Sequence, residues 1–125
     1  MSENELSQSI ITTAIGIHRQ LGPGLLESVY EEIMHYELKS LGLQVQRQVK
    51  IPVIWDDLIM PIGFRADLII NRKVIIELKS VESIHSVYPK QLLTYLKLTN
   101  IKLGLLINFN EALLKNGITR VVNNL

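Results

Sequence analysis

The pattern of apolar and polar residues predicts two helices in the first third of the chain. Over residues 6–20, apolar side chains recur every three to four positions, as on one face of a helix. A Gly-Pro-Gly segment at 22–24 then interrupts the pattern. A second helix is predicted over 25–41, and Gly42 just beyond it suits a left-handed cap. The apolar stripe expected on this second helix consists of Leu26, Val29, Ile33, Leu38 and Leu41.

Strands are predicted next, because the apolar period changes from that of a helix to that of a strand. Residues 44–55 begin with alternating polar and apolar side chains, as a half-buried strand does. Residues 62–70 and 74–80 form two further strands, joined by a short turn at 71–73.

The last third of the chain is expected to return to a helix and then to strands. Pro89 can occupy the first position of a helix that runs to about Leu98. The nearly continuous apolar run at 101–109 predicts a buried strand, and 117–122 predicts a weaker final strand. The order helix, helix, three strands, helix, strand indicates an α/β fold whose first strands are antiparallel.

Charged residues inside two of the predicted strands are the most informative feature. Strand side chains alternate between faces, so Glu77 and Lys79 share one face of the strand over 74–80. By the same rule, Arg65 and Asp67 share one face of the preceding strand. The opposite face of that strand is expected to hold Ala66, Leu68 and Ile70.

The turn at 71–73 decides which of these charges meet. A three-residue turn pairs Ile70 with Val74, and therefore Asp67 with Glu77. A two-residue turn would pair Asp67 with Ile76 and mix charged and apolar faces. The segregation of faces therefore selects the odd-length turn.

Two carboxylates in register predict a cation site. Directly opposed side chains lie roughly 5 Å apart, and like charges at that distance repel. A divalent cation resolves the conflict, since Mg²⁺ takes oxygen ligands, commonly one or two carboxylates with waters and phosphate oxygens. Lys79, on the same face as Glu77, can orient or deprotonate an attacking water, or stabilise charge on a phosphate. The alternative is an ordinary salt-bridge network on a solvated face, in which Arg65 also takes part.

Length and composition narrow the class of protein. The 125 residues, 47% of them apolar, predict a single folded domain over 1–125. A net charge of +1 neither suggests nor excludes a nucleic-acid partner. Cysteine is absent, which rules out disulfides and thiolate metal ligands. The polar start of the chain differs from a secretory signal and no apolar run is long enough to span a bilayer, so a cytoplasmic protein is expected.

Further short blocks occur in order over almost the whole chain, namely Gly24–Tyr30, Gly63–Leu68, Glu77–Lys79, Gln91–Lys97 and Gly104–Phe109. Together these blocks resemble the GxxExxY family, a group of small proteins assigned to the PD-(D/E)xK nuclease superfamily. The resemblance implies a restriction-endonuclease-like fold, with an αβββαβ core, a central mixed sheet flanked by helices, and an additional N-terminal helix.

The resemblance also implies roles for the charged residues. Asp67 and Glu77 would ligate Mg²⁺ or Mn²⁺ with help from the Leu78 carbonyl, and Lys79 would be the catalytic lysine. Glu27 would be an additional acidic residue at the metal and catalytic site, although a negative charge there also favours the start of a helix.

Other residues divide between site and core. By resemblance, Gln91 and Tyr95 line the site and bind substrate, although they also fit an ordinary helix flank. Tyr88 stands where the family pattern has a His before this helix, and a phenol cannot act as a neutral imidazole near neutral pH. Tyr30 fits a core position and a substrate contact equally, whereas a buried structural role is expected for His18.

Two functions follow from these observations. The first is a divalent-metal-dependent nuclease that hydrolyses phosphodiester bonds in DNA or a related nucleic acid. The second is a module of the same fold that binds nucleic acid or a protein partner without turnover, because a fold does not fix a function. The sequence leaves the oligomeric state open, with a homodimer as one option.

Overall fold

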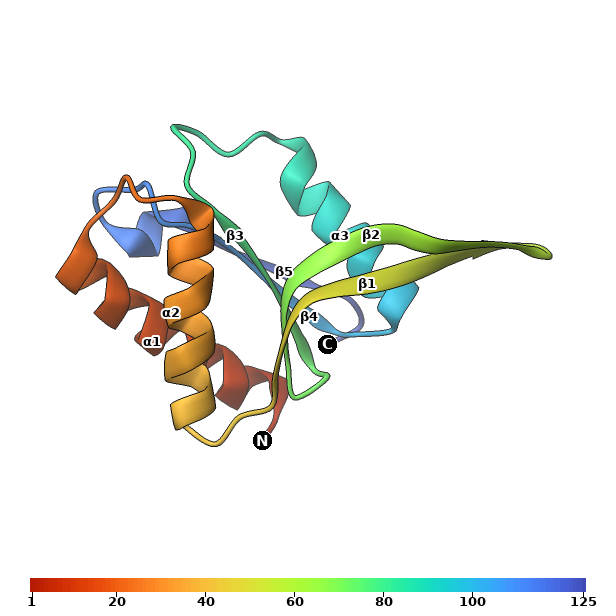
Figure 1. The fold of residues 1–125 in the computed structure, drawn as a ribbon, viewed down its shortest axis with the longest axis horizontal. Helices are drawn as coiled ribbons and strands as arrows, with labels where there is room; N and C mark the ends of the chain where they lie inside the picture. The colour runs from red at the N-terminus through yellow and green to blue at the C-terminus, as the bar shows by residue number, and fades with distance from the viewer.

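Two helices at the N-terminus cover one face of a five-stranded sheet in the computed structural model, which describes residues 1–125 (Figure 1). These are α1 (Glu3–Leu21) and α2 (Glu27–Ser40). The remaining elements are β1 (Val45–Trp55), β2 (Leu58–Ile70), β3 (Val74–Lys79), α3 (Val87–Thr99), β4 (Leu103–Asn108), a 3₁₀ turn η1 (Leu114–Gly117) and β5 (Ile118–Val122). The helix α3 covers the opposite face of the sheet from α1 and α2.

The sheet order is β1-β2-β3-β4-β5, and β3–β4 is the one parallel pair. Parallel neighbours need a crossover connection, and α3 supplies it between β3 and β4. The predicted α/β fold, with its αβββαβ core and N-terminal helix, is therefore confirmed.

The buried side of α2 differs from the predicted apolar stripe. Leu26 and Leu41 flank the helix rather than belong to it, and both are exposed, as is Val29. The buried face consists of Tyr30, Glu31, Met34 and Leu38. The prediction from apolar residues was wrong here because the buried face includes Tyr30 and Glu31. Their polar atoms are satisfied by hydrogen bonds inside the fold.

The hairpin between β2 and β3 has the predicted register. Its ladder pairs Ile70 with Val74 and continues to Leu68 with Ile76. The first two turn residues adopt left-handed backbone angles, with φ of 51° at Asn71 and 55° at Arg72. The three-residue turn that segregates the faces is therefore confirmed, and it brings the charged residues of β2 close to those at the end of β3.

The alternation of faces along β2 changes at Asp67. Leu68 and Ile70 pack under α1 and α2 as expected, but Ala66 packs on the α3 side, contrary to the prediction. The neighbouring strand changes face at the same level, where Gln48 has a left-handed φ of 48°. A single left-handed residue rotates the strand, and a strict period of two cannot anticipate it.

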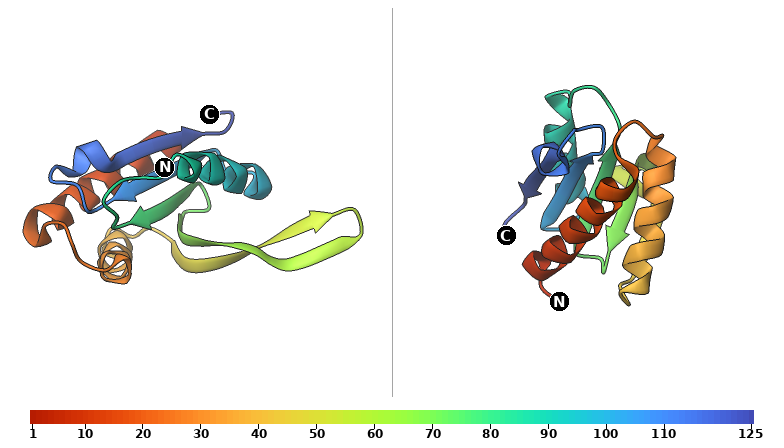
Figure 2. Two further views of the ribbon diagram at one scale, coloured as in Figure 1. Left: turned by 90° about the horizontal axis from the view of Figure 1, so that it is seen from above. Right: turned by 90° about the vertical axis from the view of Figure 1, so that its left-hand side faces the viewer.

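Beyond this level, β1 and β2 leave the body of the sheet as a long hairpin (Figures 1 and 2). β2 begins at Leu58 rather than at residue 62, because a two-residue loop at Asp56-Asp57 closes the hairpin early. The register shifts between Ile51 and Val53, and a side chain at Gly63 would overlap Val53. The inner part of the hairpin packs on the α3-side core through Ala66 and Phe64, whereas the side chains around the loop at Asp56-Asp57 are exposed, so no burial pattern marked the outer part in the sequence.

Candidate active site

The charged residues in the middle of β2 and at the end of β3 form a small cavity on the α3 side of the sheet. Its volume is about 160 Å³. The residues that line it are Arg65, Asp67, Glu77, Lys79, Tyr88, Gln91, Leu92, Tyr95 and Leu106. The structure thus brings together five residues that the sequence nominated from three separate elements: Asp67, Glu77, Lys79, Gln91 and Tyr95.

Glu77 is the buried acid of this cavity. It is 9% exposed, and its Oε1 atom has no hydrogen-bond partner. Burial raises the pKa of Glu77 to about 9, the negative charge of Asp67 acts in the same direction, and Lys79 opposes both. In the absence of a cation, Glu77 therefore carries a proton at neutral pH.

Asp67 is held in place by both neighbouring strands. Its Oδ2 atom accepts a hydrogen bond of 2.8 Å from the Leu78 backbone N–H. Its Oδ1 atom accepts a longer bond of 3.3 Å from the Gln48 side-chain amide. The backbone pairing of β2 and β3 ends at Leu68 and Ile76. Beyond that pair, the Asp67 carboxylate accepts the Leu78 N–H in place of a backbone carbonyl of β2.

Lys79 lies against an aromatic ring rather than against a carboxylate. Its Nζ atom is 4.3 Å from the centroid of the Tyr88 ring, which is a cation–π distance. Lys79 makes no salt bridge, since the two ion pairs of the chain both involve Arg47. Tyr88, which replaces the expected His, therefore supplies a face that holds the ammonium beside the two acids.

Comparison with known proteins identifies the family of the chain. Residues 4–121 match the family model described as the PD-(D/E)XK nuclease superfamily. The chain belongs to the PD-(D/E)XK nuclease superfamily. Searches of curated proteins and of solved structures gave no match. Membership indicates a nuclease-type function on a nucleic-acid substrate, and nucleases of this superfamily generally use divalent metal ions.

The donor atoms of this cavity suit a hard divalent cation. Glu77 offers a buried oxygen without any partner, beside the carboxylate of Asp67. An unpartnered buried oxygen is rare in folded proteins, and a cation bound at that oxygen is one physical cause of it. Two carboxylates are enough for Mg²⁺, which keeps several of its own waters.

Glu27 lies apart from this pair of acids. Its Oε1 atom accepts a hydrogen bond of 3.3 Å from the Ser80 backbone N–H, and it lines a neighbouring hollow with Gly24 and Asn110. Nowhere in the chain do three acidic or histidine side chains group closely enough to hold a metal ion. The role of Glu27 at the metal stays a prediction.

A second acid on α2 reaches the site through β1, and sequence reasoning missed it. Glu31 is 8% exposed, and its Oε1 atom accepts a bond of 2.5 Å from the Gln48 amide that also reaches Asp67. Arg47 neutralises its other oxygen at 3.1 Å. Two features of the sequence could have pointed to this contact: Glu31 directly follows Tyr30, and the next strand carries Arg47 as a possible partner for a buried carboxylate.

Helix α3 contributes the remaining wall. Gln91 and Tyr95 lie one turn apart on its cavity side, and the Tyr95 ring stacks on Phe64 with centroids 3.7 Å apart. Burial raises the pKa of Tyr95, and the charges of Glu77 and Asp67 add to the effect. Contact of Gln91 and Tyr95 with substrate stays a prediction.

Two other residues singled out in the sequence belong to the core. The Tyr30 hydroxyl donates a bond of 2.6 Å to the Gly22 carbonyl, and its ring stacks on Phe109. His18 is buried, with Nε2 at 2.7 Å from the Glu111 carbonyl oxygen, which confirms its structural role. Tyr30 thus holds the connection between α1 and α2, and His18 joins the end of α1 to the segment that follows β4.

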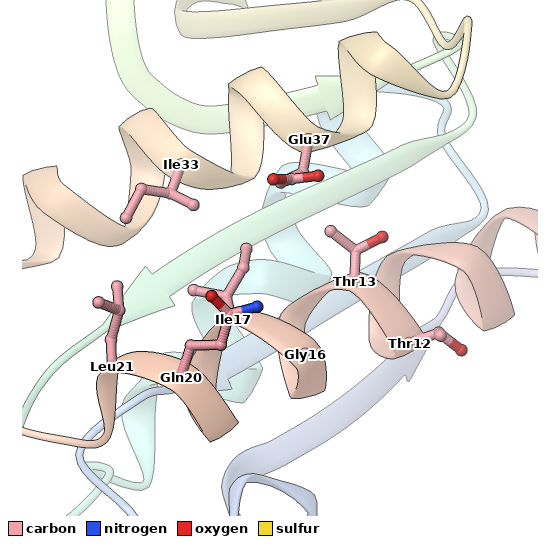
Figure 3. Close-up of a pocket in the computed structure, with 8 residues that line it drawn as sticks. All are labelled: Thr12, Thr13, Gly16, Ile17, Gln20, Leu21, Ile33 and Glu37. Atoms are coloured by element: carbon pink, nitrogen blue, oxygen red, sulfur yellow. The ribbon is translucent and has the colours of Figure 1, made fainter.

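A larger groove between α1 and α2 lies away from this chemistry (Figure 3). Its volume is about 320 Å³, and Glu37 is the one charged residue that lines it. No basic or second acidic side chain accompanies Glu37, so the groove lacks a catalytic set. None of the helices of the chain has the length and apolar content that crossing a bilayer requires.

Proposed function

We propose that this protein is a divalent-metal-dependent nuclease that hydrolyses phosphodiester bonds in DNA or a related nucleic acid. The observation that carries the proposal is the buried, unpartnered oxygen of Glu77 beside Asp67, with the Lys79 ammonium on the same wall. A structural salt-bridge network would leave no such oxygen, since Lys79 would then pair with an acid.

The proposed ion takes its protein ligands from Asp67, Glu77 and the Leu78 carbonyl. Mg²⁺ or Mn²⁺ bound there supplies Lewis-acid stabilisation of the phosphate and lowers the pKa of a water molecule. Asp67 is already oriented by the Leu78 N–H, so little rearrangement is needed on binding. Glu77 gives up its proton when it becomes a ligand.

The Lys79 ammonium is the proposed catalytic cation of the chain itself. Held over Tyr88, it faces the cavity without a competing carboxylate partner. In that place it orients the attacking water and stabilises the negative charge that develops on the phosphate oxygens.

The substrate is proposed to lie along the open side of the cavity. Arg65 is exposed at this edge, and its planar guanidinium matches two phosphate oxygens. Gln91 and Tyr95 then contact the nucleotide from α3.

The test is cleavage of DNA and RNA substrates by purified protein with Mn²⁺ or Mg²⁺. Wild type should cleave, and Asp67→Asn and Lys79→Met should each lower the rate by about 100-fold or more. Matched controls are Glu37→Gln and Lys39→Met on α2, away from the cavity, which should leave the rate unchanged. If Mn²⁺ binds but no substrate is cleaved, the hydrolytic function is wrong and the binding module takes its place.

A further inference from the structure

The projecting hairpin carries apolar side chains that its own chain leaves uncovered. We call residues 49–66 of β1 and β2 the arm. Five large apolar side chains of the arm are more than half exposed: Ile54 at 63%, Trp55 at 72%, Leu58 at 59%, Ile59 at 62% and Ile62 at 53%. Ile54 pairs with Ile59 on one face of the arm, and Trp55 pairs with Leu58 on the other face. Single exposed apolar residues are ordinary, but apolar pairs on both faces of a projection mark an interaction surface.

An apolar groove lies along one face of the same arm, lined by β1 from Gln46 to Ile54. It runs between the underside of the arm and the C-terminal end of α3, with a volume of about 540 Å³. Its apolar lining includes Val49, Ile51, Ile54, Leu98 and Ile101. Arg72 is the one charged residue of this lining.

We propose that two copies of the chain pair about a two-fold axis, with the arm tip of each copy in the groove of the other. A two-fold interface is self-complementary, so each contact of tip with groove occurs twice. One chain carries both halves of the contact, since the groove is lined by β1 of the arm whose tip projects from the sheet. This pairing does not depend on the chemistry of the candidate site.

The charges of tip and groove are complementary. Asp56 and Asp57 form the tip, and neither makes an ion pair within the chain. Arg72 at the groove is likewise without an acidic partner. Seating the tip in the groove brings these opposite charges together, whereas the same two acids would oppose entry into an anionic lipid surface.

The available area is that of an ordinary dimer. Five side chains exposed by more than half contribute ~600 Å² per protomer, since large side chains present 150–250 Å² when fully exposed. The groove lining other than Ile54, which is already counted among the five, adds the remainder of the ~800 Å² that each partner buries in a standard interface.

Trp55 at the tip is the single tryptophan of the chain, so its fluorescence reports the contact directly. Sedimentation equilibrium of the full chain should give the dimer mass at high concentration. Trp55 emission should then be that of a buried indole, and should shift to the red as dilution gives the monomer.

Two variants with matched exposure distinguish the arm from any other surface. Leu58→Lys should weaken the dimer by at least 10-fold, whereas Tyr36→Lys, on α2 and 69% exposed, should not change it. Asp57→Lys and Arg72→Glu should each weaken the dimer, and the double variant should recover part of the loss. Circular dichroism of every variant checks that the fold is retained.

Three results would overturn the proposal. The first is a monomer with solvent-exposed Trp55 emission at every concentration that can be reached. The second is a dimer that Leu58→Lys and Tyr36→Lys weaken equally. The third is a blue shift of Trp55 that appears with phosphatidylcholine vesicles and not with protein concentration, because that result would make the arm a membrane contact.

Discussion

At the scale of single residues, the candidate site depends on a carboxyl group whose charge the fold disfavours. Glu77 is buried beside Asp67, and nothing in the chain satisfies its Oε1 atom. Most buried polar atoms are paired, and leaving one unpaired lowers the stability of the fold. A position that lowers stability in this way is typical of a functional site.

The raised pKa of Glu77 predicts a particular dependence of stability on pH. In the folded chain this pKa is about 9, against an ordinary value of 4.5. Between these values the unfolded chain has lost the proton that the folded chain keeps, so stability falls as pH rises. In metal-free protein, the contribution of Glu77 to the free energy of unfolding should fall by up to ~1.4 kcal/mol per pH unit between these values, and it is fully present below the unfolded pKa.

The measurement is urea unfolding with EDTA at several pH values between the two pKa values. Glu77→Gln removes the titrating group, so its unfolding free energy should change less with pH than that of wild type. Glu37→Gln, on α2 and away from the cavity, serves as the control and should keep the wild-type slope. Equal slopes for wild type and Glu77→Gln would contradict the raised pKa.

Gln48 offers a second prediction at this scale, because its amide joins two acids. It donates to Asp67 at 3.3 Å and to Glu31, and its φ of 48° suits glycine. Gln48→Gly therefore keeps the backbone but removes the amide. Affinity for Mn²⁺, measured by calorimetry, should fall about 10- to 100-fold, as for other residues that orient metal ligands.

The control for Gln48 is its neighbour Gln46, whose side chain makes no hydrogen bond. Gln46→Ala should leave the affinity for Mn²⁺ unchanged. Unchanged affinity in Gln48→Gly as well would show that Asp67 needs no support from β1, and that the bridge to Glu31 is purely structural.

At the scale of elements, the site depends on how closely α3 approaches β4. A Cβ atom at Gly104 would lie 2.8 Å from Cγ of Leu92, so only glycine permits this contact. Leu92 is the neighbour of Gln91 on α3, and it lines the cavity itself. The glycine in the predicted strand over 101–109 thus has a role in placing the cavity wall.

Gly104→Ala should therefore destabilise the fold and disturb the cavity. Forcing a methyl group into a packed contact costs about 1–3 kcal/mol, which thermal or urea unfolding measures. Gly16→Ala is the matched control: no atom lies within 4 Å of the added Cβ, and Gly16 sits in the interior of α1 beside the open groove (Figure 3). This control should stabilise by about 0.5–1 kcal/mol. Equal effects of both substitutions would contradict the close approach.

The sequence predicted those elements whose side chains are sorted by burial on two faces. The β2–β3 hairpin is such a case, because its charges and apolar residues admit one register. The outer part of the arm is the opposite case, since its side chains on both strands are exposed and no alternation marks where β2 begins. The buried face of α2 was mispredicted because Tyr30 and Glu31 are polar, and their partners lie in other elements of the fold.

The site likewise has a part that local sequence pattern predicts and a part that depends on contacts between elements. Asp67, Glu77 and Lys79 lie on adjacent strands joined by a short turn, so local register was enough to bring them together. Gln48 and Glu31 depend on a left-handed residue in β1 and on the docking of α2, which local pattern does not encode.

At the scale of the whole molecule, the two faces of the sheet bury different numbers of residues. The core under α1 and α2 comprises 17 buried residues, and that under α3 comprises 7, so most of the burial lies on the face away from the cavity. The larger core can offset the unfavourable burial of Glu77 on the smaller one.

Metal binding should then be visible as a change in the stability of the whole domain. A ligand that binds only the folded state at ten times its Kd adds about 1.4 kcal/mol, which for this size raises Tm by roughly 4–6 °C. Thermal unfolding with millimolar Mn²⁺ should show this rise for wild type and for Glu37→Gln, and not for Asp67→Asn. Because the ion and a proton compete for Glu77, whose pKa is about 9, the rise should grow with pH. A rise in Tm that is the same at every pH would mean that the ion binds somewhere other than at Glu77.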